Sequence, residues 1–336
     1  MSARTRTMVF QLVCCAGLWL PAASRTAAQT PSPALLVLEK DDEKLDIVNP
    51  ATLKIVAQAP SGGGPHEVVA SADGRFAYVS NYITQQGPFK TISVIDLVAQ
   101  KALPPVDLGA LRGPHGLWFA AGKVYFTAEL NKVIGRYDPA GQQVDWILGT
   151  GQNVTHMVVV SGDSKRIFTS NIGSDTICEI EPGSGRGGWT VTPIPVGKGP
   201  EGFDLSPDGK EVWAANSGDG TVSVIDTSAK KVTQTIDVKT KHSNRLKFTP
   251  DGKLALISDP EGGELVVIDV ASRAVRKRIH VGKGPEGTLV QPDGAKAYVA
   301  LSGENAVAVV DLRTLAVIAK LQTGKDPDGL AWAERK

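Results

Sequence analysis

Cysteine is nearly missing from this chain. Three cysteines occur in 336 residues, and two of them, Cys14 and Cys15, lie in an apolar N-terminal run. Cys178 is then alone in the rest of the chain, which excludes an intrachain disulfide there. Its alignment with serines of other repeats predicts a small packed residue, not a nucleophile.

Long apolar runs, a strong net charge and familiar catalytic motifs are also missing. After the N-terminal run, no stretch approaches the ~20 apolar residues of a membrane span. The formal net charge is +1, which argues against a general polyanion-binding protein. The sequence has no Gly-x-Ser-x-Gly elbow, phosphate-binding loop, haem attachment motif or zinc-protease helix. We therefore expect no nucleic-acid partner and no membrane span.

The first 30 residues have the pattern of a secretory signal peptide. Arg4 and Arg6 form a basic start, residues 8–20 are a short apolar run, and small residues around Ala28 favour cleavage there. A membrane anchor is the alternative, but the run is shorter than a span needs. We assign residues 1–30 to a signal peptide and expect a periplasmic or secreted, monomeric protein.

Glycine and proline are abundant, with 36 and 21 copies, and they recur in a repeated phrase. Gly-Pro-X-Gly precedes an apolar strand and a turn of the form Ser-Pro-Asp-Gly, most clearly in residues 199–209. Seven copies, 41 to 49 residues apart, place these residues at X: His66, His115, His156, Glu201, Asn244, Glu286 and Asp328. A repeat of this length is typical of a four-stranded propeller blade.

Each repeat contains four short segments with period-two alternation, separated by turns in which an Asp can accept backbone hydrogen bonds. No window has a sustained 3.6-residue apolar period, which argues against helices. The last repeat holds one strand only, and residues 34–57 supply three more without a phrase of their own. The prediction is an all-β fold in which residues 31–336 form a single seven-bladed β-propeller, one blade closed by strands from both termini.

Residues 78–81 (Tyr-Val-Ser-Asn), 212–216 and 221–226 resemble the YVTN β-propeller repeat. That family includes exported propellers, surface-layer proteins and relatives of lactonases, so the resemblance implies this fold and leaves the activity open. Residues 113–119 and 125–130 also resemble one repeat of streptogramin lyase, which opens a lactone ring with a histidine and a divalent metal. The chain departs from the simple repeat at residues 83–90 and 183–188, which are either lids or tolerated insertions.

One position per blade becomes one ring around the channel when the blades close. Imidazole is a common ligand of zinc, copper and iron, so His66, His115 and His156 with Glu201 form a candidate set for a divalent metal ion. His242, two residues before its ring position, and Glu286 are candidates for acid or base. Alternatively, the ring residues bind water or neighbouring backbone N–H groups.

Two functions remain open from the sequence. The first is a metal-dependent, lactonase-like hydrolase or lyase acting on a small molecule. The second is a propeller that binds or scaffolds without catalysis.

Overall fold

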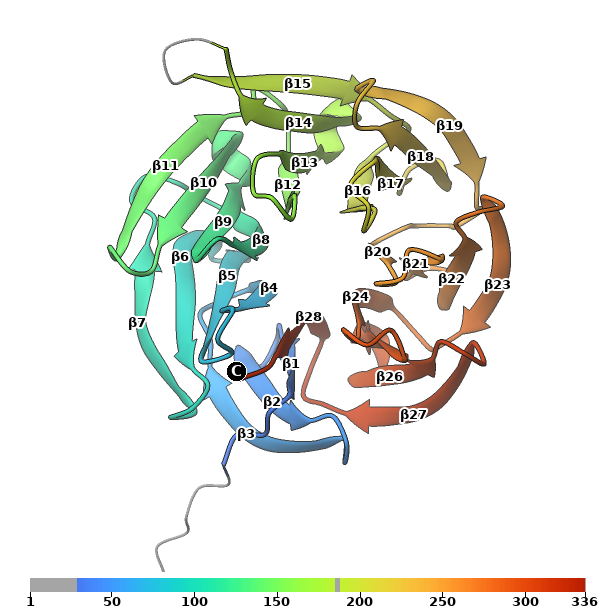
Figure 1. Cartoon of the computed structure of the whole chain (residues 1–336). Coiled ribbons are helices and arrows are strands. Elements are labelled where there is room, and N and C mark those ends of the chain that lie inside the picture. The colour runs from blue at the N-terminus through green and yellow to red at the C-terminus, as the bar shows by residue number, and fades with distance from the viewer. Residues whose placement is uncertain (1–28, 185–187, 336) are drawn as a thin grey trace, which may run out of the picture.

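The chain folds as a ring of seven four-stranded sheets around a central axis (Figure 1), as the repeats predicted. The structure is a computed structural model, and it describes residues 29–184 and 188–335. The predicted signal peptide falls almost entirely outside the described residues, so the structure does not test it. Within the described part of the chain, no helix is long and apolar enough to cross a membrane.

The blades are numbered here by their order around the axis, and each is given from its inner to its outer strand. Blade 1 consists of β28 (Pro327–Ala333), β1 (Ala34–Glu39), β2 (Lys44–Asn49) and β3 (Lys54–Pro60). Blade 2 consists of β4 (Pro65–Ala70), β5 (Phe76–Thr84), β6 (Gly87–Asp96) and β7 (Lys101–Asp107). Blade 3 consists of β8 (Pro114–Ala120), β9 (Lys123–Ala128), β10 (Val133–Asp138) and β11 (Gln143–Gly149). Blade 4 consists of β12 (Thr155–Val160), β13 (Ile167–Asn171), β14 (Thr176–Pro182) and β15 (Trp189–Pro195).

The remaining three blades follow the same order. Blade 5 consists of β16 (Pro200–Leu205), β17 (Glu211–Asn216), β18 (Thr221–Asp226) and β19 (Lys231–Asp237). Blade 6 consists of β20 (Leu246–Phe248), β21 (Leu254–Asp259), β22 (Glu264–Asp269) and β23 (Ala274–His280). Blade 7 consists of β24 (Pro285–Val290), β25 (Lys296–Leu301), β26 (Ala306–Asp311) and β27 (Ala316–Gln322). Within residues 29–184 and 188–335, three single-turn 3₁₀ helices follow second strands: η1 (Glu129–Asn131), η2 (Ile172–Ser174) and η3 (Ser302–Glu304).

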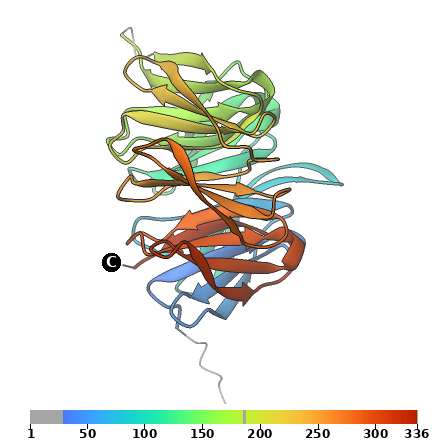
Figure 2. The same cartoon turned by 90° about the vertical axis from the view of Figure 1, so that its right-hand side faces the viewer.

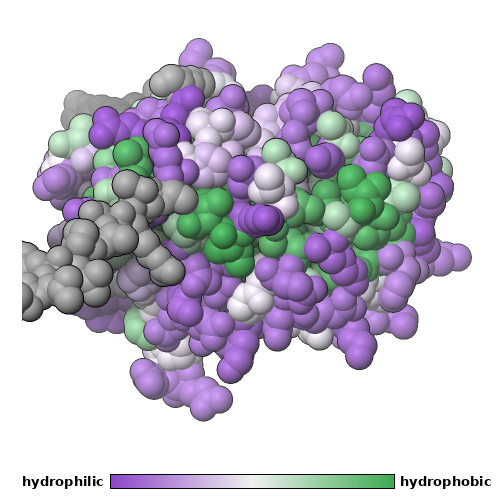
Figure 3. All heavy atoms as spheres, turned by 90° about the horizontal axis from the view of Figure 1, so that it is seen from below, coloured by the Kyte–Doolittle hydropathy of each residue, from purple (hydrophilic) through white to green (hydrophobic). Residues whose placement is uncertain are grey.

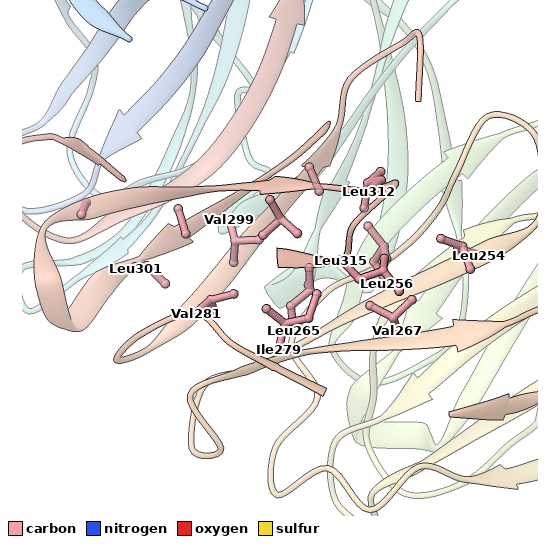
Figure 4. Close-up of a cluster of buried hydrophobic side chains, with 14 residues drawn as sticks. Leu254, Leu256, Leu265, Val267, Ile279, Val281, Val299, Leu301, Leu312 and Leu315 are labelled. Atoms are coloured by element: carbon pink, nitrogen blue, oxygen red, sulfur yellow. The ribbon is translucent and has the colours of Figure 1, made fainter. Parts of the chain in front are cut away.

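The hydrophobic core lies between neighbouring blades. Figure 4 shows one such layer, in which Leu256 and Val267 of blade 6 pack with Val299 and Leu312 of blade 7. The second and third strands are covered on both faces by such layers, so runs like Leu254–Asp259 are buried throughout. Outer strands have a partly exposed face and alternate instead, as β23 does. Seen from the rim beside blade 1, apolar residues form a band between hydrophilic ones (Figure 3).

The predicted turn chemistry is confirmed. In the turn between β16 and β17, Asp208 Oδ1 accepts hydrogen bonds from the Ser206 hydroxyl at 2.7 Å and the Lys210 N–H at 3.1 Å. At the end of β18, Asp226 Oδ1 accepts from the N–H groups of Ser228 and Ala229, each at 2.8 Å. These local bonds fix the chain reversals that the repeats need.

Closure also follows the prediction. β28 pairs antiparallel with β1, with Trp332 opposite Leu35 and Ala333 opposite Ala34. The C-terminal strand thus becomes the inner strand of a blade begun by the N-terminus, and the ring has no open edge between its first and last blades.

Residues 83–90 form a continuation of the β5–β6 hairpin. Ile83 pairs with Pro88, and Thr84 pairs with Gly87 at the tip. Figure 2 shows this hairpin projecting beyond one face of the propeller. β4 begins at the same face, because Pro65 pairs with Asn81 just below the extension. The other predicted insertion, residues 183–188, lies partly outside the described residues.

Candidate functional site

The ring positions lie at the starts of the inner strands. Six of the seven are the second residue of an inner strand, and Asn244 comes just before β20. In blades 2, 3, 4, 5 and 7 the pairing of the inner strand with the second strand shifts at this point, so the ring residue occupies a bulge. A bulge leaves its residue out of the ladder and re-aims the side chain.

The glycine after the ring residue permits close contact between blades. A Cβ on Gly116 would lie 2.5 Å from the carbonyl oxygen of His156, the ring residue of the next blade. The Thr127 hydroxyl accepts from the Gly116 N–H at 2.9 Å and donates to the same His156 carbonyl at 2.6 Å. The second Gly of the Gly-Pro-X-Gly phrase therefore allows the ring positions of neighbouring blades to pack closely and to share a hydrogen-bond partner.

Three imidazoles form a continuous row across blades 2, 3 and 4. The ring centroids of His66 and His115 are 5.2 Å apart. His115 and His156 are stacked, with centroids 3.8 Å apart and planes 30° apart. Tyr82, from the extended hairpin, lies edge-on to His66 and His115, at 4.9 and 4.8 Å. The prediction that adjacent blades bring these histidines together is confirmed by this geometry.

Glu129 completes the cluster, and the sequence analysis missed it. One of its carboxylate oxygens, Oε1, contacts Nδ1 of His156, and the other, Oε2, accepts from the Tyr82 hydroxyl. Glu129 is only 7% exposed. The side-chain donor atoms of His115, Glu129 and His156 all lie within 4.8 Å of one another, which makes them a group that could hold a metal ion.

A second repeated position explains why Glu129 and Tyr82 lie there. Each is the residue whose N–H donates to the carbonyl two residues before the ring position of its own blade, Gly113 and Gly64 respectively. The equivalent residues of blades 1 and 7, Lys40 and Ser302, make the same backbone bond. These residues form a second ring beside the first, and aligning the ends of the second strands would have revealed it.

Two fully buried imidazole nitrogens of the cluster have no hydrogen-bond partner among the described residues. They are Nδ1 of His115 and Nε2 of His156. Burial lowers the pKa of His115 well below the ordinary 6.5, and the nearby imidazoles of His156 and His66 lower it further. Burial also lowers the pKa of His66, whose Nδ1 lies 3.1 Å from the Gly64 carbonyl oxygen. A neutral imidazole keeps one nitrogen lone pair for a ligand.

The carboxylates on the other side of the ring are occupied. Glu201 accepts from Asn244 Nδ2 at 2.7 Å, and its second oxygen lies 3.3 Å from Nε2 of His242. Arg245 Nη1 is 3.7 Å from Glu201, and Arg245 Nη2 contacts Glu67 across the channel. Although burial opposes ionisation, the bond to His242 and the nearby cations hold the pKa of Glu201 below its ordinary value.

Lys40 pairs with three further carboxylates near the ring. Its Nζ lies 2.8 Å from Glu286, 3.4 Å from Asp326 and 3.5 Å from Asp328. The Ser302 hydroxyl also donates to Glu286, at 2.8 Å. The partners of Glu201 and Glu286 are thus side chains, not the backbone N–H groups considered above.

The predicted site residues therefore divide into two groups. His66, His115 and His156 lie together with Tyr82 and Glu129. Glu201 pairs with His242 and Arg245, and Glu286 pairs with Lys40. Cys178 is fully buried and accepts from Asn171 Nδ2 at 3.3 Å, as expected of a packed residue.

No family model matches the chain, and no curated protein does so either. Solved structures do match. The periplasmic gluconolactonase PpgL of Pseudomonas aeruginosa is 17% identical with a TM-score of 0.72, over 91% of this chain and 100% of its own. A putative 6-phosphogluconolactonase of Bacteroides uniformis is 16% identical with a TM-score of 0.73, over 90% of this chain and 99% of its own. Hydrazine synthase of Kuenenia stuttgartiensis is 19% identical with a TM-score of 0.67, over 80% and 89%.

These structures share the fold of this chain, and they include lactonases and other enzymes. At such identities the likeness establishes the architecture alone. The resemblance to the YVTN repeat stays a prediction.

Proposed function

We propose that the imidazole cluster binds one divalent metal ion and that the protein is a lactonase-like hydrolase or lyase acting on a small molecule. The observation that carries the proposal is a pair of buried imidazole nitrogens, on His115 and His156, that have no partner in the part of the chain that the structure describes and lie beside a carboxylate. Burying polar atoms unsatisfied is costly, so their persistence at one place favours a missing ligand.

The hydrogen bonds of the cluster assign its donor atoms. A carboxylate only accepts, so the contact with Glu129 places the proton of His156 on Nδ1 and leaves the lone pair on Nε2. Glu129 then acts as the orienting carboxylate that metal-bound histidines usually have, and Tyr82 holds its second oxygen. His115 supplies the next nitrogen, and His66 is the third imidazole within reach of the row.

Glu201 and His242 take a different part in the proposal. Glu201 already accepts from Asn244 and faces Arg245, so we assign it to His242 instead of to the metal ion. The hydrogen bond to Glu201 raises the pKa of His242, despite partial burial. His242 thus carries a proton closer to neutral pH than an ordinary histidine does, which suits an acid for a leaving alkoxide.

Opening a lactone ring would need a metal ion and a carboxylate that orients water or substrate. A divalent ion in the cluster would polarise a lactone carbonyl or activate water. Glu286 is held by Lys40 and Ser302 as a fixed carboxylate on the same ring, where it can orient the water or a substrate hydroxyl. The gluconolactonase named among the structural neighbours is consistent with a lactone as substrate.

Metal analysis tests the proposal. Purified protein exchanged into zinc and then desalted should hold one ion per chain, and the variant His115→Ala/His156→Ala should bind it about a hundredfold more weakly or not at all, because both nitrogen ligands are gone. His280→Ala is the matched control, since His280 is an exposed residue at the end of an outer strand. Equal zinc binding by wild type and the double variant would refute the metal site.

Binding without catalysis is the second candidate function. It is favoured by the low exposure of the cluster, since His115 is 2% and His156 7% exposed, and an ion there could be purely structural. Hydrolysis of a panel of aldonolactones by zinc-loaded protein separates the two. Turnover that is lost in His242→Gln, while zinc binding is kept, supports the hydrolase; bound zinc without turnover of any lactone supports the binding protein.

A further inference from the structure

We propose that the opposite end of the channel is a second ligand site, which takes a flat apolar small molecule carrying one anionic group. A cavity of about 670 Å³ opens there. Its walls are rich in aromatic side chains: Trp118, Phe119, Phe203, Phe248 and Trp332. A volume of this size and an apolar wall with few polar groups are typical of small-molecule sites.

This cavity is separate from the imidazole cluster. Its wall is built from the later residues of the inner strands, such as Val69, Phe119 and Leu289, whereas the ring residues stand at the starts of the same strands. Arg245 and Glu67 line its inner end, and they form the ion pair that crosses the channel. The pair therefore stands between the polar mouth and the apolar cavity.

Lys247 supplies the cation of the cavity. It lies on β20, and its Nζ sits 5.5 Å from the centroid of the Trp118 ring, which belongs to blade 3. Within residues 29–184 and 188–335, no carboxylate oxygen lies within 4.0 Å of this Nζ. A half-buried ammonium group over an aromatic ring gains less than one that meets an anion.

The other charged groups of the cavity already have partners. Arg245 is held by Glu67 and Glu201. Asp204 accepts from the N–H groups of Leu205 at 3.0 Å and Phe248 at 3.1 Å. Asp204 also attracts Lys247 electrostatically, but no ion pair within 4.0 Å joins them. Lys247 is therefore the cation of the cavity that an anionic ligand would meet.

The ligand class follows from these surroundings. Flat rings can stack on Trp118 once Lys247 turns toward the anionic group, and the remaining aromatic side chains cover an apolar body. A neutral ligand of the same shape would gain the apolar contacts but not the ion pair. A cationic ligand would be repelled by Lys247.

A pair of dyes tests the proposal. Anilinonaphthalene sulfonate is flat, apolar and anionic, and N-phenylnaphthylamine has a similar shape without the charge; both fluoresce more strongly in apolar surroundings. Native protein should bind the sulfonate saturably at one site. Lys247→Met should weaken the sulfonate about tenfold, the size of one charge-assisted hydrogen bond, and change the neutral dye less than about twofold. Lys277→Met, at an exposed lysine of outer strand β23, is the matched control.

Trp118→Leu should weaken both dyes, and circular dichroism with thermal unfolding verifies that each variant is folded. Equal affinity of wild type and Lys247→Met for the sulfonate would overturn the proposal, as would non-saturable binding by the folded wild type. The result is independent of the metal site, because His115→Ala/His156→Ala should leave dye binding unchanged. Loss of dye binding in that folded double variant would instead place the dye at the polar mouth and refute a second site.

Discussion

The two halves of the polar ring differ in how their buried polar side chains are paired. In blades 5, 6, 7 and 1, buried acids are matched by the cations Lys40 and Arg245, which lie at the centre of the group. In blades 2 to 4, three imidazoles lie in a row, and two of their buried nitrogens have no partner among the described residues. The carboxylate half is balanced in charge by its two cations, although Oδ1 of Asp328, 4.0 Å from Arg245, also has no hydrogen-bond partner among the described residues. The imidazole half has nitrogen lone pairs that could still bind an ion.

This difference indicates which half is balanced in charge and which half could still bind an ion. A buried cation among acids cannot be removed without a large loss of stability, since several buried carboxylates are then left unpaired. A neutral imidazole with a free lone pair can accept an ion without breaking an existing bond. The four predictions below test this contrast, from the largest expected effect to the smallest.

Arg245→Met should produce the largest loss of stability. It leaves Glu67, Glu201 and Asp328 without their central cation, and breaking a buried ion pair from one side costs about 3–5 kcal/mol of unfolding free energy. Urea unfolding followed by circular dichroism measures it.

Two comparisons frame that value. Arg278→Met removes a half-exposed pair with Glu264 at 2.9 Å and should cost at most about 1 kcal/mol. His115→Leu in the imidazole half removes a polar group that lacks one partner and should change stability by less than about 1 kcal/mol. If Arg245→Met lowers the free energy of unfolding no more than Arg278→Met does, Arg245 does not stabilise the carboxylate half.

Acid should destabilise the imidazole half in metal-free protein. The pKa of His115 is well below 6.5 in the folded state, so below about pH 6.5 the unfolded chain takes up the proton and the folded chain does not. Stability is therefore lost as pH falls from 6.5 to 5, by up to about 2 kcal/mol from this residue at 1.4 kcal/mol per pH unit. His66 contributes in the same direction.

His115→Gln should reduce this acid loss, as measured by urea unfolding of chelator-treated protein at pH 5 and 7. Identical pH dependence in wild type and variant would contradict the neutral state of buried His115.

Tyr82→Phe should weaken zinc binding about tenfold, because Glu129 loses the hydroxyl that holds its second oxygen and orients His156 less well. Competition with a zinc-chelating dye measures the affinity. Ser302→Ala is the matched change in the carboxylate half, where it removes the bond to Glu286, and it should leave zinc affinity within about twofold. If both substitutions weaken zinc binding equally, the bond from Tyr82 to Glu129 has no specific part in binding zinc.

His242→Gln should have the smallest effect, and its sign is opposite to that of His115. Glu201 raises the pKa of His242, so the pair stabilises the fold below about pH 6.5 and the stabilisation is lost as pH rises through the folded pKa. The side chain is 43% exposed, so screening limits the effect to a few tenths of a kcal/mol. The free energy of unfolding should fall slightly more between pH 8 and pH 5.5 in His242→Gln than in wild type, because the variant lacks a contribution that opposes the acid loss. A smaller fall in the variant would place His242 among the buried imidazoles.

Much of the site could be read from the sequence, because it depends on a repeated position. The alignment of the Gly-Pro-X-Gly phrases placed His66, His115 and His156 in adjacent blades, and the structure brings them into a row. Glu129 and Tyr82 were missed, since one follows a second strand and the other lies near the end of one, in segments that share no common residue type. Lys40 was missed because the phrase of its blade, around Asp328, lies at the other end of the chain.

The sequence by itself determined the number of blades, their closure through both termini and the residues of the first ring, because local turn chemistry and strand alternation repeat at one period. Only the tertiary structure decided which acids are neutralised, which buried imidazole nitrogens have no partner among the described residues, and that Arg245 and Glu67 pair across the channel between two unlike ends. Those outcomes depend on side chains from opposite blades meeting across the axis, and neither periodicity nor spacing encodes the direction and reach of a side chain.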